Sequence, residues 1–496
     1  MTEASRSFVE DARREKLAAL RALGVEPFAY RFARTHTTAE AVRAFEPGDR
    51  ARVRVAGRIV SRRGHGKSTF MHIEDASGRV QLYLKSDVVG ERAYEIAQLC
   101  DLGDFVGVGG YMFATRTGET TVHVDDFELL TKALRPLPAG KADASGEQHG
   151  TLADPEQRAR ERYADLAVHA DARDVVRLRA RVLRMIRGFL DGQGYIEVET
   201  PVLQPVYGGA LARPFETHYR ALDGTFYLRI ATELYLKRCI VGGLERVYEI
   251  GRDFRNEGID RLHNPEFTML EFYGAYLDYE DVMRQLETMV HDVVVAVAGA
   301  PVIDRFGVTC DFTVPWRRVT YASLVRDRAG LELTADDAAF RAVLRTRDVP
   351  DVDAMPRGKL LDEVFKHFVE PTLEQPTLVV DYPLDISPLA KVKRGDPTLV
   401  ERFEFYVAGR ELANAFSELN DPDDQLRRFD LQTAAREAGD AEAHAVDRDY
   451  VRALEYGMPP TGGCGLGIDR LVMLLAEQRS IRDVILFPML RPGPAA

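Results

Sequence analysis

The spacing of apolar residues changes along the chain, and each change marks a different kind of structure. Helical spacing predicts a helix over residues 6–23, ended by Gly24 and Pro27. Its apolar stripe is Phe8, Leu17, Leu20 and Leu23, with Arg13, Arg14 and Lys16 elsewhere on the helix. From residue 52 to residue 130 the pattern becomes an alternation of two, broken by glycine-containing turns, which predicts about five short strands. Such a series is typical of a small Greek-key barrel of the OB type.

Alternation within this barrel assigns side chains to its two faces. We expect five apolar residues to point inward: Met71, Ile73, Val80, Leu82 and Leu84. The outward set contains Phe70, His72, Gln81 and Tyr83. Exposed aromatic rings on a barrel suit the stacking of nucleic-acid bases.

The rest of the chain predicts a separate α+β domain. A stretch rich in Pro, Gly, Ala and polar residues begins at residue 136 and has almost nothing to bury, so it reads as a linker. A helical pattern over residues 171–191 and several strand-like segments follow it. We therefore expect four regions: an N-terminal helical segment at 1–50, the barrel at 51–135, a linker at 136–165, and an α+β domain at 166–496 with a helical insertion at about 320–370.

Composition and charge narrow the class of protein. The net charge is -12, but residues 1–140 hold 21 Lys and Arg against 19 Asp and Glu, which gives +2 there and leaves -14 for the remainder. If nucleic acid binds, the first segment should hold it. The four cysteines form no CxxC pair, which argues against a zinc site or a disulfide framework. No signal pattern or membrane-spanning run is evident, so we expect a cytoplasmic protein without a membrane partner.

One segment of the α+β domain carries a pattern suited to a ligand. Residues 246–273 read as strand, polar loop and strand, and the returning strand places Phe267, Met269, Glu271 and Tyr273 on one face. An aromatic ring, a carboxylate and a phenol suit a ligand better than a core. Near the loop lie Arg255, Glu257, Arg261 and His263, which together could cradle a polyphosphate. The alternative is an exposed charged hairpin.

Two later segments add to this pattern. The glycine-rich stretch at 462–467 precedes a helix starting near Asp469, so Arg470 would lie at its positive end, where a phosphate is stabilised. Residues 402–421 carry Glu404, Glu411 and Glu418 among apolar residues, with Asn414 and Phe416 between them. Carboxylates are costly to bury without a cation, which indicates a divalent metal or a basic ligand. The alternatives are an ordinary glycine turn and surface charges on strands.

Three strings resemble the signature motifs of one family. The stretch GYIEVETPVL resembles motif 1 of the class II aminoacyl-tRNA synthetases, FRNEGIDRLHNPEFTMLEFY resembles motif 2, and GLGIDRLVMLL resembles motif 3, in the family's order. The neighbouring strings GGALARPF, ELYLKR, NAFSELND and EYGMPPTGG resemble bacterial lysyl-tRNA synthetases. The likeness covers nearly the whole chain. It implies a class II catalytic domain, built on an antiparallel sheet flanked by helices, and an OB-fold that binds the anticodon.

The resemblance also implies roles for individual residues. Arg255 and Arg470 would be catalytic, and the ATP-binding set would be Arg255, Glu257, His263, Phe267 and Arg470. Glu404 and Glu411 match the carboxylates that bind Mg²⁺. The lysine-binding set would be Gly209, Glu233, Arg255, Glu271, Tyr273, Asn414, Phe416 and Glu418, with Glu418 and Tyr273 receiving the ε-ammonium. For Glu233 and Glu271, an ion pair with a nearby arginine is the alternative.

The barrel residues implied by the resemblance are Phe70, Gln81 and Glu119, which would contact the anticodon. Arg52, Arg54, Arg58, Arg62 and Arg63 are candidate phosphate partners, or else a solvated strand edge. Three positions depart from the family pattern: Thr232 stands where proline is usual, and Ala413 and Ala415 where glycines are usual. We expect these departures to crowd the lysine pocket or its wall, which puts lysine affinity and side-chain tolerance in doubt more than the type of reaction.

The resemblance therefore implies ATP-dependent activation of L-lysine and its transfer to tRNA(Lys), by a homodimer joined through motif 1 near Pro201. One alternative is a paralogous lysyltransferase that uses lysyl-adenylate on a non-tRNA acceptor, and another is a catalytically silent regulator that binds nucleotide or RNA. An aspartyl- or asparaginyl-tRNA synthetase shares the architecture, but clustered carboxylates would repel an acidic substrate.

Overall fold

The computed structural model describes residues 7–142, 148–437 and 446–491, except the single residues 47, 49 and 211. The chain forms two compact units, Met1–Ala153 and Asp154–Ala496, and the boundary between them falls within the predicted linker. Parts of the predicted regions lie outside the described residues: 1–6, 47 and 49 of the N-terminal segment, 143–147 of the linker, and 211, 438–445 and 492–496 of the α+β domain.

Five strands of the first unit close into a barrel in the order β1-β2-β3-β5-β4. They are β1 (Arg52–His65), β2 (Ser68–Glu74), β3 (Arg79–Lys85), β4 (Phe105–Ala114) and β5 (Thr120–Thr131). The five residues predicted to point inward are at most 2% exposed, and the outward set is half-buried, so the predicted alternation is confirmed. Helices α2 (Thr38–Arg43), α3 (Ser86–Val89) and α4 (Glu91–Leu99) complete this unit together with α1 (Phe8–Ala22).

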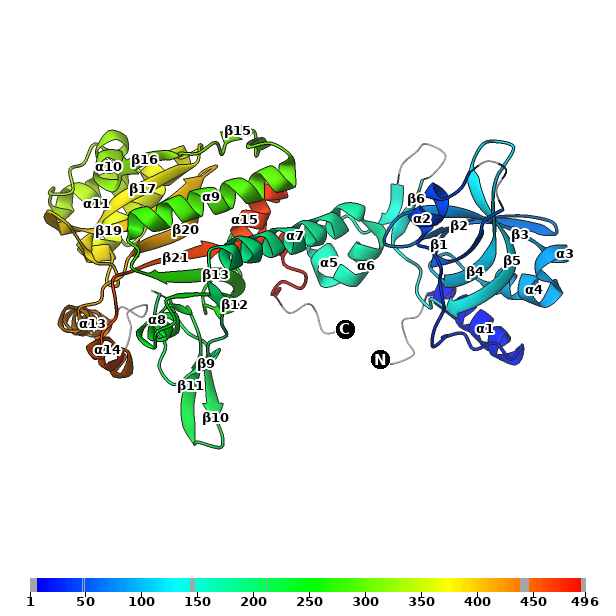
Figure 1. Cartoon of the computed structure of the whole chain (residues 1–496), viewed down its shortest axis with the longest axis horizontal. Helices are drawn as coiled ribbons and strands as arrows, with labels where there is room; N and C mark the ends of the chain where they lie inside the picture. Colours follow the sequence, from blue (N-terminus) through cyan, green and yellow to red (C-terminus); the bar gives the residue numbers. More distant parts are fainter. Residues whose placement is uncertain are drawn as a thin grey trace. The chain divides into compact units, whose positions relative to one another are not determined.

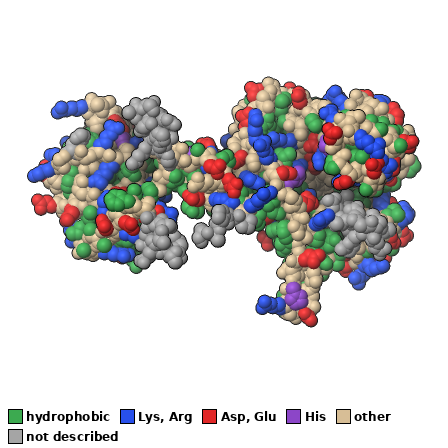
Figure 2. Space-filling model, turned by 180° about the vertical axis from the view of Figure 1, so that it is seen from behind, with side chains coloured by type: hydrophobic (Ala, Val, Ile, Leu, Met, Phe, Trp, Pro, Cys, Tyr) green, Lys and Arg blue, Asp and Glu red, His purple; other side chains and the backbone are tan. Residues whose placement is uncertain are grey.

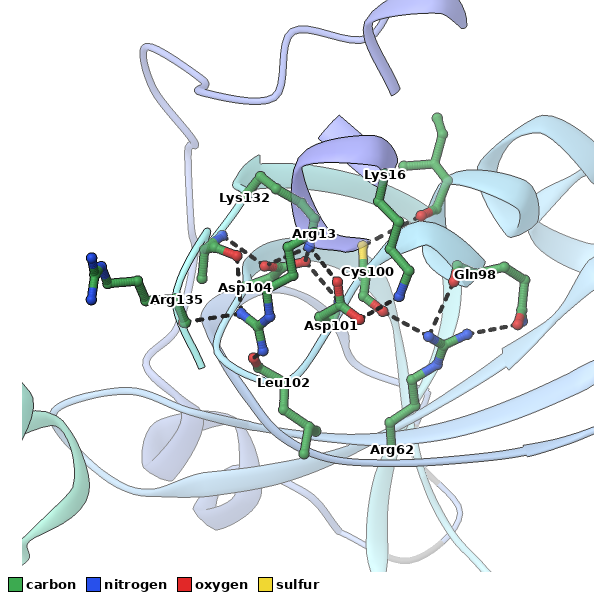
Figure 3. Close-up of polar contacts among 12 residues, drawn as sticks. Arg13, Lys16, Arg62, Gln98, Cys100, Asp101, Leu102, Asp104, Lys132 and Arg135 are labelled. Atoms are coloured by element: carbon green, nitrogen blue, oxygen red, sulfur yellow. Dashed lines mark hydrogen bonds and ion pairs between the residues drawn. The ribbon is translucent and has the colours of Figure 1, made fainter. Parts of the chain in front are cut away.

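Helix α1 differs from its prediction at two residues. Leu17 and Leu20 are buried as expected, but Phe8 is 87% exposed, because the first turn of the helix extends past the surface on which its later turns pack. Arg13, expected on a polar face, is buried instead. Its guanidinium donates to the carbonyl oxygens of Leu102, Ala133 and Arg135 at 2.8–3.1 Å (Figure 3). These bonds compensate its burial and tie α1 to the segment that follows β5.

A buried ionic cluster lies beside Arg13. The Lys132 side chain is fully buried, and its ammonium contacts Asp101 at 2.7 Å and Asp104 at 2.9 Å (Figure 3). Asp104 also accepts from the backbone N–H groups of Ala133 and Asp101, and Asp101 accepts from Lys16 of α1. Every charged group of this cluster therefore has a partner within the unit, as buried charges require.

The segment predicted as a linker contains regular elements. Strands β6 (Ala139–Ala142) and β7 (Gln148–Thr151) pair as a two-stranded sheet. Helices α5 (Pro155–Arg160) and α6 (Arg162–Val168) follow and begin the second unit.

The second unit is built on one large, mainly antiparallel sheet in the order β16-β17-β19-β20-β21-β13-β12-β8 (Figure 1). Only its two end pairs, β16 with β17 and β12 with β8, are parallel. The strands are β8 (Ile196–Glu197), β12 (Arg246–Phe254), β13 (Glu266–Ala275), β16 (Arg317–Thr320), β17 (Thr377–Pro383), β19 (Asp396–Val407), β20 (Arg410–Ser417) and β21 (Thr461–Gly467), with β18 (Val392–Lys393) paired to β19.

Helices cover both faces of this sheet. One face carries α7 (Ala170–Gly192), α9 (Tyr279–Ala298) and α15 (Ile468–Leu475), whose apolar residues form a core with Leu270 and Phe272 of β13 (Figure 1). A second core involves α8 (Glu233–Val241) and the predicted helical insertion. That insertion consists of α10 (Tyr321–Ala329), α11 (Asp337–Arg345), α12 (Arg357–Val364) and the π-helical turn Phe365–Val369. The predicted α+β class is confirmed.

Smaller elements surround the sheet. Strands β9 (Leu203–Gln204), β10 (Glu216–Tyr219) and β11 (Gly224–Leu228) form a three-stranded sheet whose β10–β11 hairpin projects from the unit, with charged side chains of both signs near its tip (Figure 2). The remaining elements are β14 (Val302–Arg305), β15 (Val308–Asp311), the 3₁₀ turns Glu370–Thr372 and Leu384–Ile386, α13 (Pro422–Glu437), α14 (Arg448–Glu455) and α16 (Ile481–Val484). Among the described residues, no helix is both long and apolar enough to span a bilayer.

Candidate active site

A cavity of about 340 Å³ lies over β13, β20 and β21 in the second unit. It collects almost every residue that the sequence singled out for substrate binding. The predicted residues that line it are Gly209, Glu233, Arg255, Glu257, His263, Phe267, Glu271, Tyr273, Glu411, Asn414, Phe416, Glu418 and Arg470. Glu404 does not line it.

Strand β13 supplies the floor of the cavity through its alternation. Phe267, Glu271 and Tyr273 line the cavity together with Met269, as the pattern predicted, whereas Leu270 on the opposite face is fully buried in the core. The antiparallel neighbours β12 and β21 hold this register along the strand. The ligand-facing strand of the sequence analysis is therefore confirmed as a cavity wall.

One end of the cavity carries guanidinium groups. Arg255 lies over the Phe267 ring at 5.0 Å from its centroid. Arg470 donates to the Glu411 backbone oxygen at 2.9 Å, forms an ion pair with its carboxylate at 3.1 Å, and lies 3.4 Å from His263 Nε2. This end therefore combines aromatic surface with positive charge, which suits a nucleotide.

The helix that carries Arg470 is fixed at its first turn. The carboxylate of Asp469 accepts from Arg179 of α7 at 2.5 Å and from the Thr268 backbone N–H at 2.7 Å. Arg179 also donates to the Thr268 hydroxyl at 2.8 Å. Helix α7, strand β13 and helix α15 are thus joined under the cavity, so Arg470 has a fixed base. The sequence analysis missed Arg179, because only the fold brings it to Asp469.

The other end of the cavity is lined by buried carboxylates. Glu233, Glu271 and Glu418 are each at most 7% exposed. A fully buried lysine, Lys237, forms ion pairs with Glu233 at 2.5 Å and with Glu418. Beyond that ion pair, neither oxygen of Glu418 has a hydrogen-bond partner. Glu233 thus does form the ion pair given as the alternative, but its partner is Lys237, four residues further along α8, and not an arginine.

Burial and mutual repulsion shift the pKa values at this end. Burial raises the pKa of Glu271 to about 8, and the nearby carboxylates of Asp253 and Glu233 contribute to the increase. The Tyr273 hydroxyl donates to Glu271 at 2.8 Å and lowers that pKa in part. Burial alone would lower the pKa of Lys237, but Glu233 and Glu418 raise it above its ordinary value, so this ammonium keeps its charge. The site holds an excess of acidic groups over bases and is suited to a cationic ligand.

Two glycines give this end its shape. Gly209 has a φ of +92°, a conformation that favours glycine, and its backbone lies beside Ala231 and Glu233. At Gly463 of β21, a Cβ atom would overlap both the Glu418 carboxylate and the Tyr273 ring. These two side chains can therefore occupy their places only above a residue without a side chain.

The departures from the family pattern have visible consequences. Thr232 precedes α8, and its backbone N–H donates to Glu271 at 3.3 Å, a bond that proline could not make. Its hydroxyl is buried without a partner. The expectation that Ala413 and Ala415 crowd the pocket is wrong: both are fully buried in the core on the far face of β20, so their methyl groups do not narrow the cavity.

Asn414 and Phe416 lie on the cavity side of β20. Arg402 of β19 donates to the Asn414 side chain at 2.9 Å, and the Phe416 ring lies 5.3 Å from the Lys237 ammonium. Arg402 also lines the cavity, but the sequence analysis did not select it. Its position opposite Phe416 in the strand pairing becomes clear only from the register.

The two carboxylates expected to bind metal lie in different surroundings. Glu411 lines the cavity and its side chain is 37% exposed. Glu404 lies behind it, where its carboxylate accepts from the hydroxyls of Tyr382 and Tyr406 and from Arg402 at 2.5 Å. A third carboxylate, Glu370, belongs to the same neighbourhood: burial and the charges of Glu411 and Glu404 raise its pKa to about 7, although Arg470 opposes the shift.

The outer face of the barrel carries two rows of side chains that cross its strands. The aromatic row joins Phe70, Tyr83, His123 and Tyr111, with ring centroids 4.7, 5.5 and 4.8 Å apart. The polar row lies two residues away and contains His72 and Gln81, which both contact Glu119. The three residues implied for anticodon contact therefore belong to one surface.

The arginines proposed as phosphate partners are mostly engaged within the barrel. Arg52 and Arg54 form ion pairs with Asp125 and Asp126, and Arg58 donates to the Gly103 carbonyl. Arg62 donates to the Cys100 carbonyl and the Gln98 side chain (Figure 3). Within the described residues, Arg63 is the member of the set with no such partner. Neither expectation fits these four as stated: β1 is paired on both sides within a closed barrel and is no strand edge, and Arg52, Arg54, Arg58 and Arg62 contact groups of the barrel itself.

Comparison with known proteins places this geometry in a class. Residues 154–491 match the family model of the tRNA synthetases class II (D, K and N), and residues 53–130 match that of the OB-fold nucleic acid binding domain. The chain is thus a class II tRNA synthetase with an OB-fold unit, as the resemblance implied. Among curated relatives, a lysine-tRNA ligase of Pelotomaculum thermopropionicum is 51% identical over 97% of this chain and 94% of its own length. One of Enterococcus faecalis is 48% identical over 99% of this chain and all of its own. The chain therefore belongs to the lysine-tRNA ligase family.

Proposed function

We propose that this protein activates L-lysine with ATP and transfers the lysyl group to the 3′ end of tRNA(Lys). The observation that carries the proposal is the single cavity with two guanidinium groups at one end and three buried carboxylates at the other. A doubly aminated amino acid would place its ammonium groups among the carboxylates and its carboxylate toward Arg255. The relatives named lysine-tRNA ligase support the same activity.

The catalytic work is positioning and charge stabilisation. Arg255 would hold the lysine carboxylate and the α-phosphate together, so that the carboxylate oxygen attacks phosphorus in line and pyrophosphate leaves. Phe267 offers a ring for the adenine, and Arg470 and His263 lie where the outer phosphates would sit, with Glu257 also at the nucleotide. No protein nucleophile is needed.

Selection of lysine would come from charge at the end of the cavity that carries the buried carboxylates. Glu418 and Tyr273 would receive the ε-ammonium, while Glu233, Glu271 and the Gly209 backbone would surround the α-ammonium. Asn414 and Phe416 would form the wall between them. A neutral side chain would leave the buried Glu418 with its ion pair to Lys237 but no hydrogen-bond donor, a penalty of about 1–3 kcal/mol.

The carboxylates near Arg470 fit a magnesium ion. Glu404, Glu411 and Glu370 raise one another's energy when all are charged, as the raised pKa of Glu370 indicates, and a divalent cation would relieve that repulsion. Among the described residues, no ready group of three acidic, histidine or cysteine ligands exists, but Mg²⁺ usually binds through one or two carboxylates and substrate phosphates. We propose Glu411 as a direct ligand and Glu404 behind it. When bound, the ion would neutralise charge on the phosphates.

We further propose that Phe70, Gln81 and Glu119 contact the tRNA anticodon. Base stacking on the aromatic row and hydrogen bonds from the polar row are two interactions by which proteins bind the unstacked bases of single-stranded RNA. Tyr83, which packs on Phe70, extends the stacking surface. An intact barrel face favours tRNA over the alternative of a lysyltransferase with a non-tRNA acceptor.

A homodimer through motif 1 is the expected assembly. Strand β8 forms one edge of the large sheet, and its Ile196 is 52% exposed. Val202 and Leu203, just beyond Pro201, are 40% and 41% exposed. An exposed edge with neighbouring apolar side chains is a surface that a second copy would cover. Sedimentation of Ile196→Asp beside the parent chain tests this, since a dimer should dissociate.

We place the enzyme in the cytoplasm, where tRNA is charged.

ATP-pyrophosphate exchange with each amino acid, followed by aminoacylation of total tRNA, tests the activity. Lysine should stimulate exchange far more than any other amino acid, and tRNA(Lys) should be the species charged. Exchange driven by another amino acid would overturn the assignment. Exchange with lysine but no tRNA charging would instead favour a lysyltransferase with another acceptor.

A further inference from the structure

His72 occupies the centre of the polar row on the barrel face. It lies on β2, between Ser61 of β1 and Gln81 of β3 in the strand pairing. Its Nδ1 atom is 2.7 Å from the Ser61 hydroxyl, and its Nε2 atom is 2.7 Å from a Glu119 carboxylate oxygen. The histidine therefore bridges the barrel wall and the carboxylate.

The partners of His72 fix where its proton lies. A charged carboxylate only accepts hydrogen bonds, so Nε2 must carry the hydrogen that points to Glu119. In the neutral ring, Nδ1 is then an acceptor, and the Ser61 hydroxyl donates to it. The ring orientation and tautomer are thus determined by one partner on each side.

The same contacts determine the orientation of Gln81. Its amide nitrogen donates to the second Glu119 oxygen at 2.6 Å, and its amide oxygen accepts from the Thr121 hydroxyl at 2.9 Å. With the nitrogen side directed to Glu119, the amide cannot reverse without losing both bonds. The Glu119 carboxylate and the Gln81 amide are therefore held together in one fixed arrangement.

Without His72, the Glu119 carboxylate would lose one of its two hydrogen-bond donors and keep only Gln81. The Glu119 side chain is 46% exposed and lies just before β5, so a free glutamate there would sample several rotamers. Ordering such a side chain on binding costs conformational entropy. A carboxylate already held by two donors has met that cost before RNA arrives.

We propose that His72 is a positioning residue for RNA recognition, which holds Glu119 and, through it, Gln81 in the orientation that meets a base edge. This rests on the proposed anticodon role of Glu119 and Gln81, and adds a residue that neither the motif resemblance nor the relatives' names assign. His72 acts through Glu119 and needs no contact with RNA itself.

The test compares His72→Ala with Glu119→Ala and the double variant, in the full chain. ATP-pyrophosphate exchange, which needs no tRNA, should be unchanged in all three, which shows that the lysine site is intact. In aminoacylation, His72→Ala should raise KM for tRNA(Lys) about tenfold with kcat unchanged, as expected for a lost hydrogen bond to a charged group. Adding His72→Ala to Glu119→Ala should change KM less than twofold further.

Two more variants separate positioning from structure. His72→Gln keeps an N–H near the Nε2 position and should recover KM to within about threefold of the parent. His36→Ala removes another histidine of the barrel unit, whose ring lies beside Thr35. It should leave KM for tRNA(Lys) unchanged.

Three results would overturn the inference. An unchanged KM in His72→Ala shows that the histidine positions nothing. A full further loss when His72→Ala is added to Glu119→Ala shows that it acts independently of that carboxylate. A Glu119→Ala variant that charges tRNA normally defeats the anticodon role together with the inference, whereas the first two results leave that role standing.

Discussion

Each unit of the protein contains a fully buried lysine between two carboxylates, but the two clusters are satisfied to different degrees. Around Lys132 in the barrel unit, the carboxylates also accept from backbone N–H groups and from Lys16. Around Lys237 in the synthetase unit, Glu418 has no partner besides that lysine. A cluster with every bond made holds a fold together, whereas one that lacks partners is ready to receive a ligand. The completeness of the bonding, and not burial or charge, separates the two.

We call the fully bonded cluster around Lys132 the closed cluster and the one around Lys237 the open cluster. Mutation of the closed cluster should have the larger effect on stability. Lys132→Met leaves Asp104 buried without its cation and should lower the free energy of unfolding by about 3–5 kcal/mol. Because Trp316 is the single tryptophan of the chain and lies in the synthetase unit, its fluorescence cannot follow the barrel. Hydrogen-deuterium exchange of β1 to β5 should show the loss, with ATP-pyrophosphate exchange preserved.

Lys16→Met is the matched control for that variant. Lys16 also contacts Asp101, but its side chain is 36% exposed, so its removal should cost less than about 1 kcal/mol. An equal decrease in the free energy of unfolding in the two variants would show that the burial of Lys132 does not increase its contribution to stability.

Mutation of the open cluster around Lys237 should reduce activity and leave stability nearly unchanged. Glu418→Gln removes the acceptor for the lysine ε-ammonium and should reduce kcat/KM for lysine about a hundredfold, corresponding to ~3 kcal/mol. The unfolding midpoint followed by Trp316 fluorescence should hardly move, because Lys237 keeps its ion pair with Glu233. Glu455→Gln, an exposed position on α14, is the control. Unfolding in place of lost activity would show that this cluster is structural as well.

The open cluster should also respond to pH. Because the pKa of Glu271 is about 8, this side chain holds a proton below that pH and cannot attract an ammonium group. KM for lysine should therefore fall as pH rises, by about fivefold between pH 7 and pH 8, and lysine binding should release a proton. Calorimetry in buffers of different ionisation enthalpy measures that release. A KM that rises over the same interval contradicts the shift.

The smallest effect should come from the Thr232 backbone. Thr232→Pro removes the N–H that donates to Glu271 and should raise KM for lysine about two- to fivefold at pH 7, by moving the Glu271 pKa further upward. Thr232→Ala keeps the N–H and removes only the hydroxyl, so its KM should equal that of the parent. If the two variants behave alike, the backbone bond contributes nothing to the site.

The sequence predicted best where side-chain direction follows from strand alternation alone. The inward residues of β2 and β3 and the cavity face of β13 needed no partner to be placed, because successive side chains of a strand point to opposite faces. The start of α15 near Asp469 followed from the glycine-rich strand before it.

Charged residues were predicted less well, because their burial depends on groups far along the chain. Arg13 is buried by carbonyl groups more than 80 residues away, and Glu404 is held behind the cavity by two tyrosines. Lys237 carried a local signal, its spacing of four from Glu233 on a helix, but that spacing alone does not distinguish a surface pair from a buried one. The roles of the site residues stay predictions until substrates are bound.

Gly463 has a consequence for how substrate choice could change over evolutionary time. Any side chain at this position would displace the carboxylate and the phenol above it, so the depth of the amino-acid pocket depends on one codon. A lineage that acquired even a methyl group there would need compensating changes at both neighbours. A change toward shorter diamino acids through this position would therefore require several coordinated substitutions.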